Sequence, residues 1–441
     1  MKILIANYRY FVSGGPERYL FNVSDGLTAR GHKLVPFSIR YSQNEPSPYS
    51  HYFVEPLGSA DEVTFAEQRR TIGTLWRTTR RLFYAPDVEK AVTRLVAEER
   101  PQIAYILHYL RKLSPSLIVA LKRTGLPVVV RLSDYAMLCP QAHCLRDELP
   151  CTLCIGGDLL PSVRNRCVQG STNASVLNAV ATWYHRRRRY FDLIDVFVTT
   201  TQFMHKMMLE AGVPERRLRC IPTPVDGSRF APQPEAAQKS YVAYAGALRR
   251  IKGVHVLVEA FAMLRRRRPD LDARLRIAGA GEPQYVDQLR EQVASSGLHD
   301  AVEFVGKLGA PQLSDFLGRA ALSVVPSLWY ENLPNAILES YSCGTPVLAA
   351  DLGSLPECVV DGESGYLFRG GDARDLAERL EYCLDRPDEL AGMGLAARRL
   401  AQDVYSPQKH LESLERLFAE LGAGQCSPRA VTCDSPPPSA A

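Results

Sequence analysis

The sequence predicts an α/β protein in which two Rossmann-like domains face each other across a cleft. Its 441 residues suit two domains of roughly 150–200 residues rather than one compact core. Short apolar runs alternate with amphipathic helical stretches, which is the pattern of βαβ units and parallel sheets. The alternation is interrupted at 220–230, where Pro222, Pro224 and Gly227 follow neither period. We therefore expect one domain at 1–220 and a second at 221–404.

The elements of the first half follow from its apolar runs. Residues 2–8 form a strand, because this run is too short and too soon interrupted to be the apolar region of a secretory signal. A helix at 16–30 and a strand at 32–40 come next. Further strands are predicted at 102–107, 128–132 and 195–199, and the last of these is expected to close the first sheet.

The second half repeats the alternation, with strands predicted at 241–245, 274–278, 302–305, 322–325 and 346–349. Several of these strands run directly into Gly246, Gly279, Gly306 or Pro326. Open α/β sheets bind ligands outside the carboxyl ends of their strands, where glycine lets the backbone approach a ligand. Tight turns are the alternative explanation for each glycine. Their recurrence in one domain favours a ligand site.

The chain ends with a predicted helix and a tail. Residues 405–421 carry leucines and Phe418 at helical spacing, with Ser406 as N-cap and Pro407 at the first helical position. We expect this helix to return to the first domain. Residues 422–441 are rich in proline and alanine and are predicted to be disordered.

The composition is that of a globular protein, with 46% hydrophobic and 23% charged residues. Its net charge of +5 permits contact with anions but does not demand a nucleic-acid partner, and we expect none. The arginine runs 186–189 and 265–268 are expected to be solvated helix faces. Alternatively, 186–189 draws the protein to anionic lipids.

The sequence predicts a cytoplasmic protein. It contains no apolar run of about 18 residues that could cross a bilayer as a helix. Its eleven cysteines without a signal peptide favour the reducing cytoplasm. Peripheral contact with the inner face of the membrane is the alternative location.

Five cysteines lie close together in a loop at 139–167, namely Cys139, Cys144, Cys151, Cys154 and Cys167. The two-residue spacing of Cys151 and Cys154 lets both thiolates reach one tetrahedral ion, and Cys139 with Cys167 would complete four sulfurs. The outer spacings match no standard zinc motif. Reduced thiols, a structural zinc and a redox pair therefore remain as three interpretations, in that order.

The window 325–339 carries the most chemical information. A buried strand ends at Pro326, a polar and aromatic loop containing Glu331 follows, and Pro334 can start a helix that carries Glu339. Free N–H groups at a helix N-terminus suit a phosphate. Glutamates beside these N–H groups can accept hydrogen bonds from two adjacent hydroxyl groups of a ligand. These features together fit a sugar nucleotide, whereas a surface glutamate and a helix-dipole partner are the alternative interpretation.

The two glutamates, preceded by Pro326-Ser327 and followed by Gly344-Thr345-Pro346, resemble the signature of the family-4 retaining glycosyltransferases of the GT-B fold. Further matching motifs lie at 14–18, 246–253, 277–281, 304–306, 355–357 and 361–365. The resemblance spans about residues 1–421. It implies transfer of a sugar from a nucleoside diphosphate (NDP) sugar to an acceptor hydroxyl with retention, in bacterial surface polysaccharide or glycolipid synthesis.

The resemblance also implies roles for individual residues. Glu331 would contact the donor sugar, Lys252 would neutralise the diphosphate leaving group, and Glu339 would bind the ribose hydroxyls. The other implied donor-binding residues are Gly14, Gly15, Arg249, Gly306, Lys307, Asn332 and Leu333. The first domain would recognise a saccharide or lipid-linked acceptor. No cofactor is expected for the chemistry, which leaves the structural zinc as the one cofactor considered.

Two positions depart from the family pattern. Ala247 stands where the family has an arginine, for which Arg249 or Arg250 could substitute. Ser133 stands where the family has a donor-contacting histidine, and His108 is the nearest histidine candidate. These departures favour a second function, that of a non-catalytic sugar-nucleotide-binding paralogue. An NDP-sugar epimerase on the same fold is a separate alternative.

Overall fold

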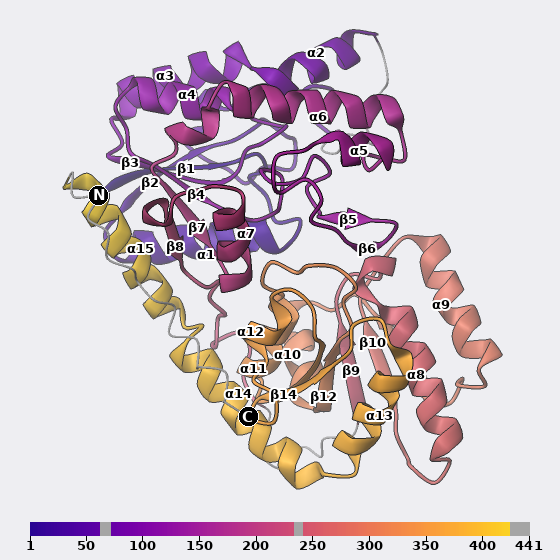
Figure 1. The fold of residues 1–441 in the computed structure, drawn as a ribbon. Coiled ribbons are helices and arrows are strands. Elements are labelled where there is room, and N and C mark those ends of the chain that lie inside the picture. The colour runs from indigo at the N-terminus through magenta and orange to yellow at the C-terminus, as the bar shows by residue number, and fades with distance from the viewer. Residues whose placement is uncertain (62–71, 233–240, 424–441) are drawn as a thin grey trace.

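The computed structural model describes residues 1–61, 72–232 and 241–423. They form two α/β domains, each built on a six-stranded parallel sheet, with helices on both faces (Figure 1). The cleft between the domains is lined by residues of both. The predicted fold class is therefore confirmed.

The sheet of the first domain has the strand order β2-β1-β3-β4-β7-β8. Its strands are β1 (Lys2–Asn7), β2 (Lys33–Phe37), β3 (Ile103–His108), β4 (Val128–Arg131), β7 (Val196–Thr199) and β8 (Leu218–Cys220). Central strands are buried along nearly their whole length, as expected for a parallel sheet covered on both faces. The order reverses between β1 and β3, which is the position where such sheets bind ligands.

The helices of this domain form two layers. Residues of α3 (Pro86–Glu99), α4 (Ser116–Arg123) and α7 (Gln202–Glu210) share one core with the sheet. The other face packs against α1 (Gly15–Ala29) and α15 (Pro407–Gly422). Two more helices, α2 (Ile72–Phe83) and α6 (Thr172–Arg187), lie over the first layer (Figure 1). The cysteine-containing loop carries the two-residue strands β5 (Leu145–Arg146) and β6 (Leu149–Pro150) and the short helix α5 (Leu160–Arg164).

The second sheet has the order β11-β10-β9-β12-β13-β14 and reverses between β9 and β12. Its strands are β9 (Tyr241–Ala245), β10 (Leu275–Ala278), β11 (Val302–Gly306), β12 (Ala320–Val325), β13 (Val347–Ala350) and β14 (Gly365–Phe368). The surrounding helices are α8 (Val254–Arg267), α9 (Pro283–Ser295), α10 (Ala310–Gly318), α11 (Asn335–Ser342), α12 (Leu355–Cys358), α13 (Ala373–Leu384) and α14 (Pro387–Asp403).

Two edge strands differ from the sequence prediction. The prediction that 195–199 closes the first sheet is wrong, because β8 pairs in parallel outside β7. At the other end of the chain, β14 pairs with β13 and was not predicted. Both are short strands beside charged or glycine-containing segments, so they lack an extended apolar run. The predicted strand 32–40 is shorter in the structure, where β2 ends at Phe37.

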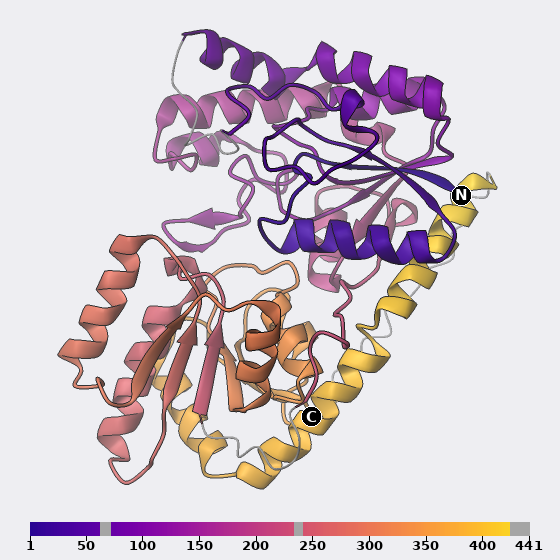
Figure 2. The same ribbon diagram turned by 180° about the vertical axis from the view of Figure 1, so that it is seen from behind.

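Helix α15 leaves the second domain and runs along the first (Figure 2). Leu414, Leu417 and Phe418 pack into the core beneath α1. A Cβ atom at Gly26 would lie 2.6 Å from Leu411, so glycine permits this close helix contact. The predicted disordered tail lies almost entirely outside the described residues, which end at 423. Among the helices described, none is long and apolar enough to cross a membrane.

Candidate active site

A cavity of about 620 Å³ opens between the domains at the carboxyl ends of both sheets. The first domain lines it with Ser13, Gly15, Pro16, Arg18, Tyr19, Arg131, Ser133 and Thr223. The second domain contributes residues that follow β9, β10, β11 and β12, together with the start of α11. The cavity therefore lies where the strand-order reversals of the two sheets meet.

Lys252 and Glu331 form an ion pair in this cavity. Lys252 Nζ lies 2.6 Å from Glu331 Oε1, and the Ser327 hydroxyl donates to the same oxygen at 2.6 Å. Glu331 is only 5% exposed. Lys252 also lies over the Trp329 ring, with Nζ 5.2 Å from the centroid, a cation–π contact. The lysine and the glutamate named from the sequence thus form one unit.

The local backbone explains how this pair is positioned. Lys252 ends a 3₁₀ turn (Arg250–Lys252) that is capped by Gly253 in the left-handed region, at φ 71°. A Cβ atom on Gly253 would lie 1.8 Å from the Pro326 carbonyl oxygen, so only glycine fits. The Leu328 N–H donates to the Ile251 carbonyl at 2.9 Å. These contacts hold the lysine turn against the glutamate loop.

Glu339 lies in α11 and points toward the first domain. Arg18 of α1 donates to Glu339 Oε1 at 3.1 Å across the cavity. Burial raises the pKa of Glu339 above its usual range, and the Arg18 guanidinium opposes that shift. The carboxylate is thus held at the cleft wall by a cation of the other domain. Arg18 received no role from the sequence, although it stands in the motif at 14–18.

The N-terminus of α11 faces the cavity. No side chain caps it, so its free N–H groups remain available to an anion. Leu333, Pro334 and Asn335 line the cavity at this point. A Cβ atom at Gly15 of the first domain would lie 3.0 Å from Asn335 Nδ2, so the two domains come close together here. Gly15 and Lys307 also line the cavity, as the family motif implies.

Asn332 binds the first domain with both ends of its side-chain amide. Its Nδ2 donates to the Leu132 carbonyl at 2.8 Å, and its Oδ1 accepts from Thr200 at 2.5 Å. Tyr135 adds a third link by donating to the Glu331 carbonyl at 3.2 Å. The backbone amide of Asn332, rather than its side chain, is therefore the group available to a ligand.

The first-domain wall contains a cation that sequence reasoning missed. Arg131, at the end of β4, is buried and lines the cavity. It donates to Ser133 at 2.9 Å and to Thr223 at 2.6 Å, and its guanidinium lies 3.9 Å from the Tyr19 ring centroid. A charged residue in an otherwise apolar strand was the signal that could have identified it.

His108 and Asp134 form a second polar pair beside this wall. His108 Nε2 lies 2.6 Å from Asp134 Oδ2, and the imidazole packs edge-on against Tyr8. Although burial lowers the pKa of His108, the charge and hydrogen bond of Asp134 outweigh it and raise that pKa. The pKa of Asp134 falls to about 2, because contacts with His108 outweigh its own burial.

The structure does not bring every residue named from the sequence into the cavity. Gly14, Gly306, His108 and Arg249 are not among the described residues that line it. Arg249 is exposed, whereas Arg250 pairs with Glu148 of the first domain. Arg186 also differs from its predicted solvated state, because it donates to the Met137 and Leu138 carbonyls. The five cysteines line a separate small pocket.

Two family models match this chain. The model described as "Glycosyl transferases group 1" matches residues 239–386, and the "Glycosyl transferase 4-like domain" matches residues 14–224. A D-inositol 3-phosphate glycosyltransferase from Arthrobacter sp. is 37% identical over 166 residues, which are 38% of this chain and 39% of that protein. One from Thermobispora bispora is 32% identical over 255 residues, covering 53% and 59% of the two chains. The match thus spans less than two thirds of the length of these relatives.

Solved structures share the fold over nearly the whole chain. Sucrose-phosphate synthase from Thermosynechococcus elongatus superimposes with a TM-score of 0.71 at 18% identity, covering 96% of this chain and 99% of that one. Anabaena HepE in complex with UDP-glucose gives a TM-score of 0.63 at 18% identity, with 96% and 100% covered. Both likenesses concern the two-domain architecture.

Proposed function

Since the chain belongs to the family-4 glycosyltransferases of the GT-B fold, we propose that it transfers a glycosyl group from an NDP-sugar to an acceptor hydroxyl with retention of anomeric configuration. The observation that carries this proposal is the Lys252–Glu331 pair beside the uncapped N-terminus of α11. A cation, free N–H groups and a buried carboxylate meet there in one cavity. A diphosphate and a polyol together require these groups.

In the proposed reaction the bond between the anomeric carbon and the diphosphate breaks, and its electron pair goes to the phosphate oxygen. The acceptor oxygen forms the new bond on the same face, and its proton passes to the departing diphosphate. Lys252 and the N–H groups of α11 stabilise the charge that develops on the leaving group. Glu331, freed from Lys252, stabilises positive charge at the anomeric carbon and binds sugar hydroxyls. Glu339 holds the ribose.

The donor is thus an NDP-sugar in the second domain, and the acceptor enters against the first. On that side the cavity presents Ser133 and Arg131, and the His108–Asp134 pair lies next to it. These polar groups suit a hydroxyl-bearing saccharide. We propose that the acceptor is a saccharide or lipid-linked saccharide of surface polysaccharide or glycolipid synthesis.

Release of NDP from a panel of NDP-sugars, measured with and without saccharide acceptors, tests the function. We expect release that depends on acceptor, and a loss of about 10²–10³-fold in kcat for Glu331→Gln. Turnover of the NDP-sugar to an isomer without acceptor would instead identify an epimerase. Tight binding with no turnover for any donor would identify a binding paralogue. Full activity of Glu331→Gln would refute the mechanism.

A second observation supports contact with a membrane. Val176, Val180 and Trp183 form an exposed stripe along α6, at 42%, 45% and 59% exposure. These positions recur on one helix face, where a soluble helix usually presents polar side chains. Trp76 on the neighbouring α2 is 67% exposed. Large apolar side chains gathered on one face indicate an interaction surface.

Charge complementarity favours an anionic bilayer as the partner of this surface. Arg187, Arg188 and Arg189 follow the α6 stripe and are exposed. Tryptophan prefers the interface between water and hydrocarbon, and each arginine near an anionic surface contributes about 1 kcal/mol. Co-sedimentation with phosphatidylglycerol vesicles should exceed that with phosphatidylcholine vesicles.

The variant Trp183→Ser should weaken vesicle binding at least about tenfold, and Leu395→Ser, at an exposed position (66%) on α14, should leave it unchanged. Equal binding to both vesicle types, or equal losses in both variants, would refute the membrane surface. Dimerisation lost with Trp183→Ser would assign the surface to a second copy instead.

A further inference from the structure

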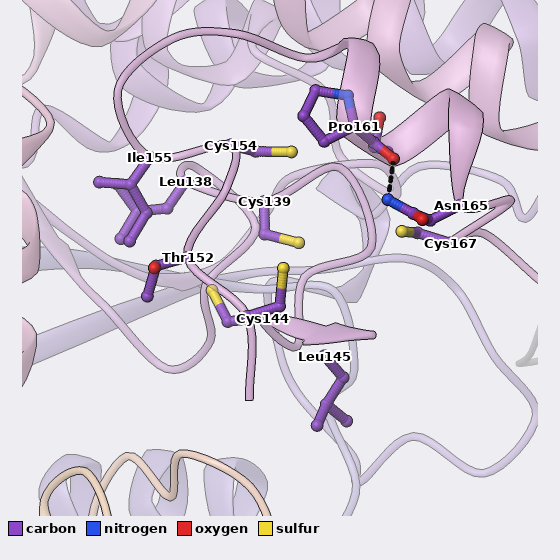
Figure 3. Close-up of a pocket in the computed structure, with 12 residues that line it drawn as sticks. Leu138, Cys139, Cys144, Leu145, Thr152, Cys154, Ile155, Pro161, Asn165 and Cys167 are labelled. Carbon is purple, nitrogen blue, oxygen red and sulfur yellow. Dashed lines mark hydrogen bonds between the residues drawn. The ribbon is translucent and has the colours of Figure 1, made fainter. Parts of the chain in front are cut away.

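The five cysteines of the loop at 139–167 line one small pocket in the first domain (Figure 3). Cys139, Cys144 and Cys154 are buried, and Cys151 and Cys167 are half-buried. The sulfurs of Cys139, Cys144 and Cys154 point toward a common space, and Cys167 lies at its edge (Figure 3). The cavity is about 10 Å³, which is roughly the space of a single water molecule or ion.

The loop around this pocket has little regular structure of its own. It contains a pair of two-residue strands and the five-residue helix α5. Of the ten described non-glycine residues with positive φ, six lie between Ala142 and Gln169. Such conformations cost free energy and persist only where the surroundings hold them. Apolar packing supplies part of that restraint through Leu138, Leu145 and Ile155.

We propose that this pocket binds one structural Zn²⁺ ion through the thiolates of Cys139, Cys151, Cys154 and Cys167. Cys151 and Cys154 have the two-residue spacing from which two sulfurs reach one tetrahedral ion. Cys139 and Cys167 approach from the two ends of the loop, so the ion would join its beginning to its end. Zinc takes four thiolates in closed structural sites, and the binding free energy stabilises the fold directly.

The thiols must move to close around the ion. Among the residues described, no group of three or more histidine, cysteine or acidic side chains is placed so that it could hold a metal ion without such a movement. Cys144 is the fifth thiol of the pocket and stands outside the proposed ligand set, which takes the two-residue pair Cys151 and Cys154 and the cysteines at the two ends of the loop.

The ion would hold the loop against the donor site. His143, within the loop, lies 5.9 Å from Trp329 between ring centroids, and Glu148 pairs with Arg250 at 2.5 Å. The loop also supports Tyr135, whose N–H donates to the Ala142 carbonyl. Because Tyr135 donates to the Glu331 carbonyl, a loosened loop would disturb the contact between the domains.

Metal analysis of the full-length protein, purified with a reductant and washed with a chelator, tests the proposal. We expect about one zinc ion per chain. Cys151→Ser and Cys167→Ser should each lower the zinc content at least about fivefold. Cys144→Ser and Cys383→Ser, a buried cysteine of the second domain, are the matched controls and should retain it.

A measurement on the wild-type protein tests the proposal even where a variant fails to fold. Protein produced with Co²⁺ in place of Zn²⁺ should show thiolate-to-cobalt charge transfer and the visible bands of a tetrahedral site. Folded wild type without zinc and without these bands would overturn the proposal, as would a disulfide among the five cysteines in the freshly isolated protein. Retention of zinc by Cys167→Ser together with its loss from Cys144→Ser would overturn the ligand assignment.

Discussion

Lys252→Met tests the proposed mechanism, because it removes the cation that pairs with Glu331, the carboxylate proposed to act in catalysis. In the structure Lys252 Nζ lies 2.6 Å from Glu331 Oε1. When the donor binds, this charge faces the diphosphate. A single positioned donor to developing negative charge typically contributes about 2.7–4 kcal/mol, so kcat should fall about 10²–10³-fold. The affinity for free NDP should fall less, because the interaction strengthens as the leaving group forms.

The substitution also changes the unliganded protein. It leaves the buried Glu331 carboxylate with Ser327 as its remaining side-chain donor in the described structure. Breaking a buried pair costs about 3–5 kcal/mol. Lys252 is partly exposed, so water can replace some of that interaction, and we expect about 1–3 kcal/mol of lost stability. Chemical denaturation measures this loss separately from turnover.

Lys122→Met is the matched control for the loss of a lysine–carboxylate pair. Lys122 pairs with Asp195 at 2.9 Å outside the cleft, and the two lysines are similarly exposed, whereas Asp195 is 31% exposed against 6% for Glu331. Steady-state NDP release and calorimetric NDP binding are measured for both variants. A Lys252→Met enzyme with kcat within about threefold of wild type would refute the leaving-group role. Equal losses of kcat in both variants would attribute the effect to general destabilisation.

Three further predictions concern a core leucine, a buried histidine and the Arg18–Glu339 pair. Leu414→Ala should lower the free energy of unfolding by about 2–5 kcal/mol in urea denaturation, because the side chain is fully buried beneath α1. Leu395→Ala should change it by less than about 0.5 kcal/mol. Burial lowers the pKa of His410 to about 3 in the folded protein. The unfolded chain keeps the ordinary histidine pKa of about 6.5, so between these two pH values it binds one more proton than the folded protein. Stability should then fall by about 1.4 kcal/mol per pH unit below about pH 6.5, and His410→Gln should flatten that dependence. A slope unchanged in His410→Gln would contradict this assignment. Arg18→Met removes the cation that opposes the raised pKa of Glu339. On acidification, donor affinity measured by calorimetry should therefore begin to fall at a higher pH than in wild type, and an unshifted pH profile would contradict the pairing.

The sequence predicted the fold class because parallel strands buried on both faces leave continuous apolar runs. It predicted the loop that carries Glu331, and it named Lys252 through the resemblance to the family, because both lie in short local motifs. Edge strands β8 and β14 were missed because they depend on pairing with a neighbour rather than on their own composition. Arg18 and Glu339 are 321 positions apart, and no local pattern connects them.

The two departures from the family pattern have a structural counterpart in Arg131. Ala247 and Ser133 remove an arginine from one wall of the cleft and an imidazole from the other. Arg131 donates to Ser133 and lines the cavity from the first domain, while Lys252 lines it from the second. Cations therefore face the cavity from both domains without those two side chains. Arg131 belongs to the first domain, and the Asn332 side chain joins the second domain to the first through Leu132 and Thr200. The place of this first-domain cation at the cavity therefore depends on how the two domains are joined.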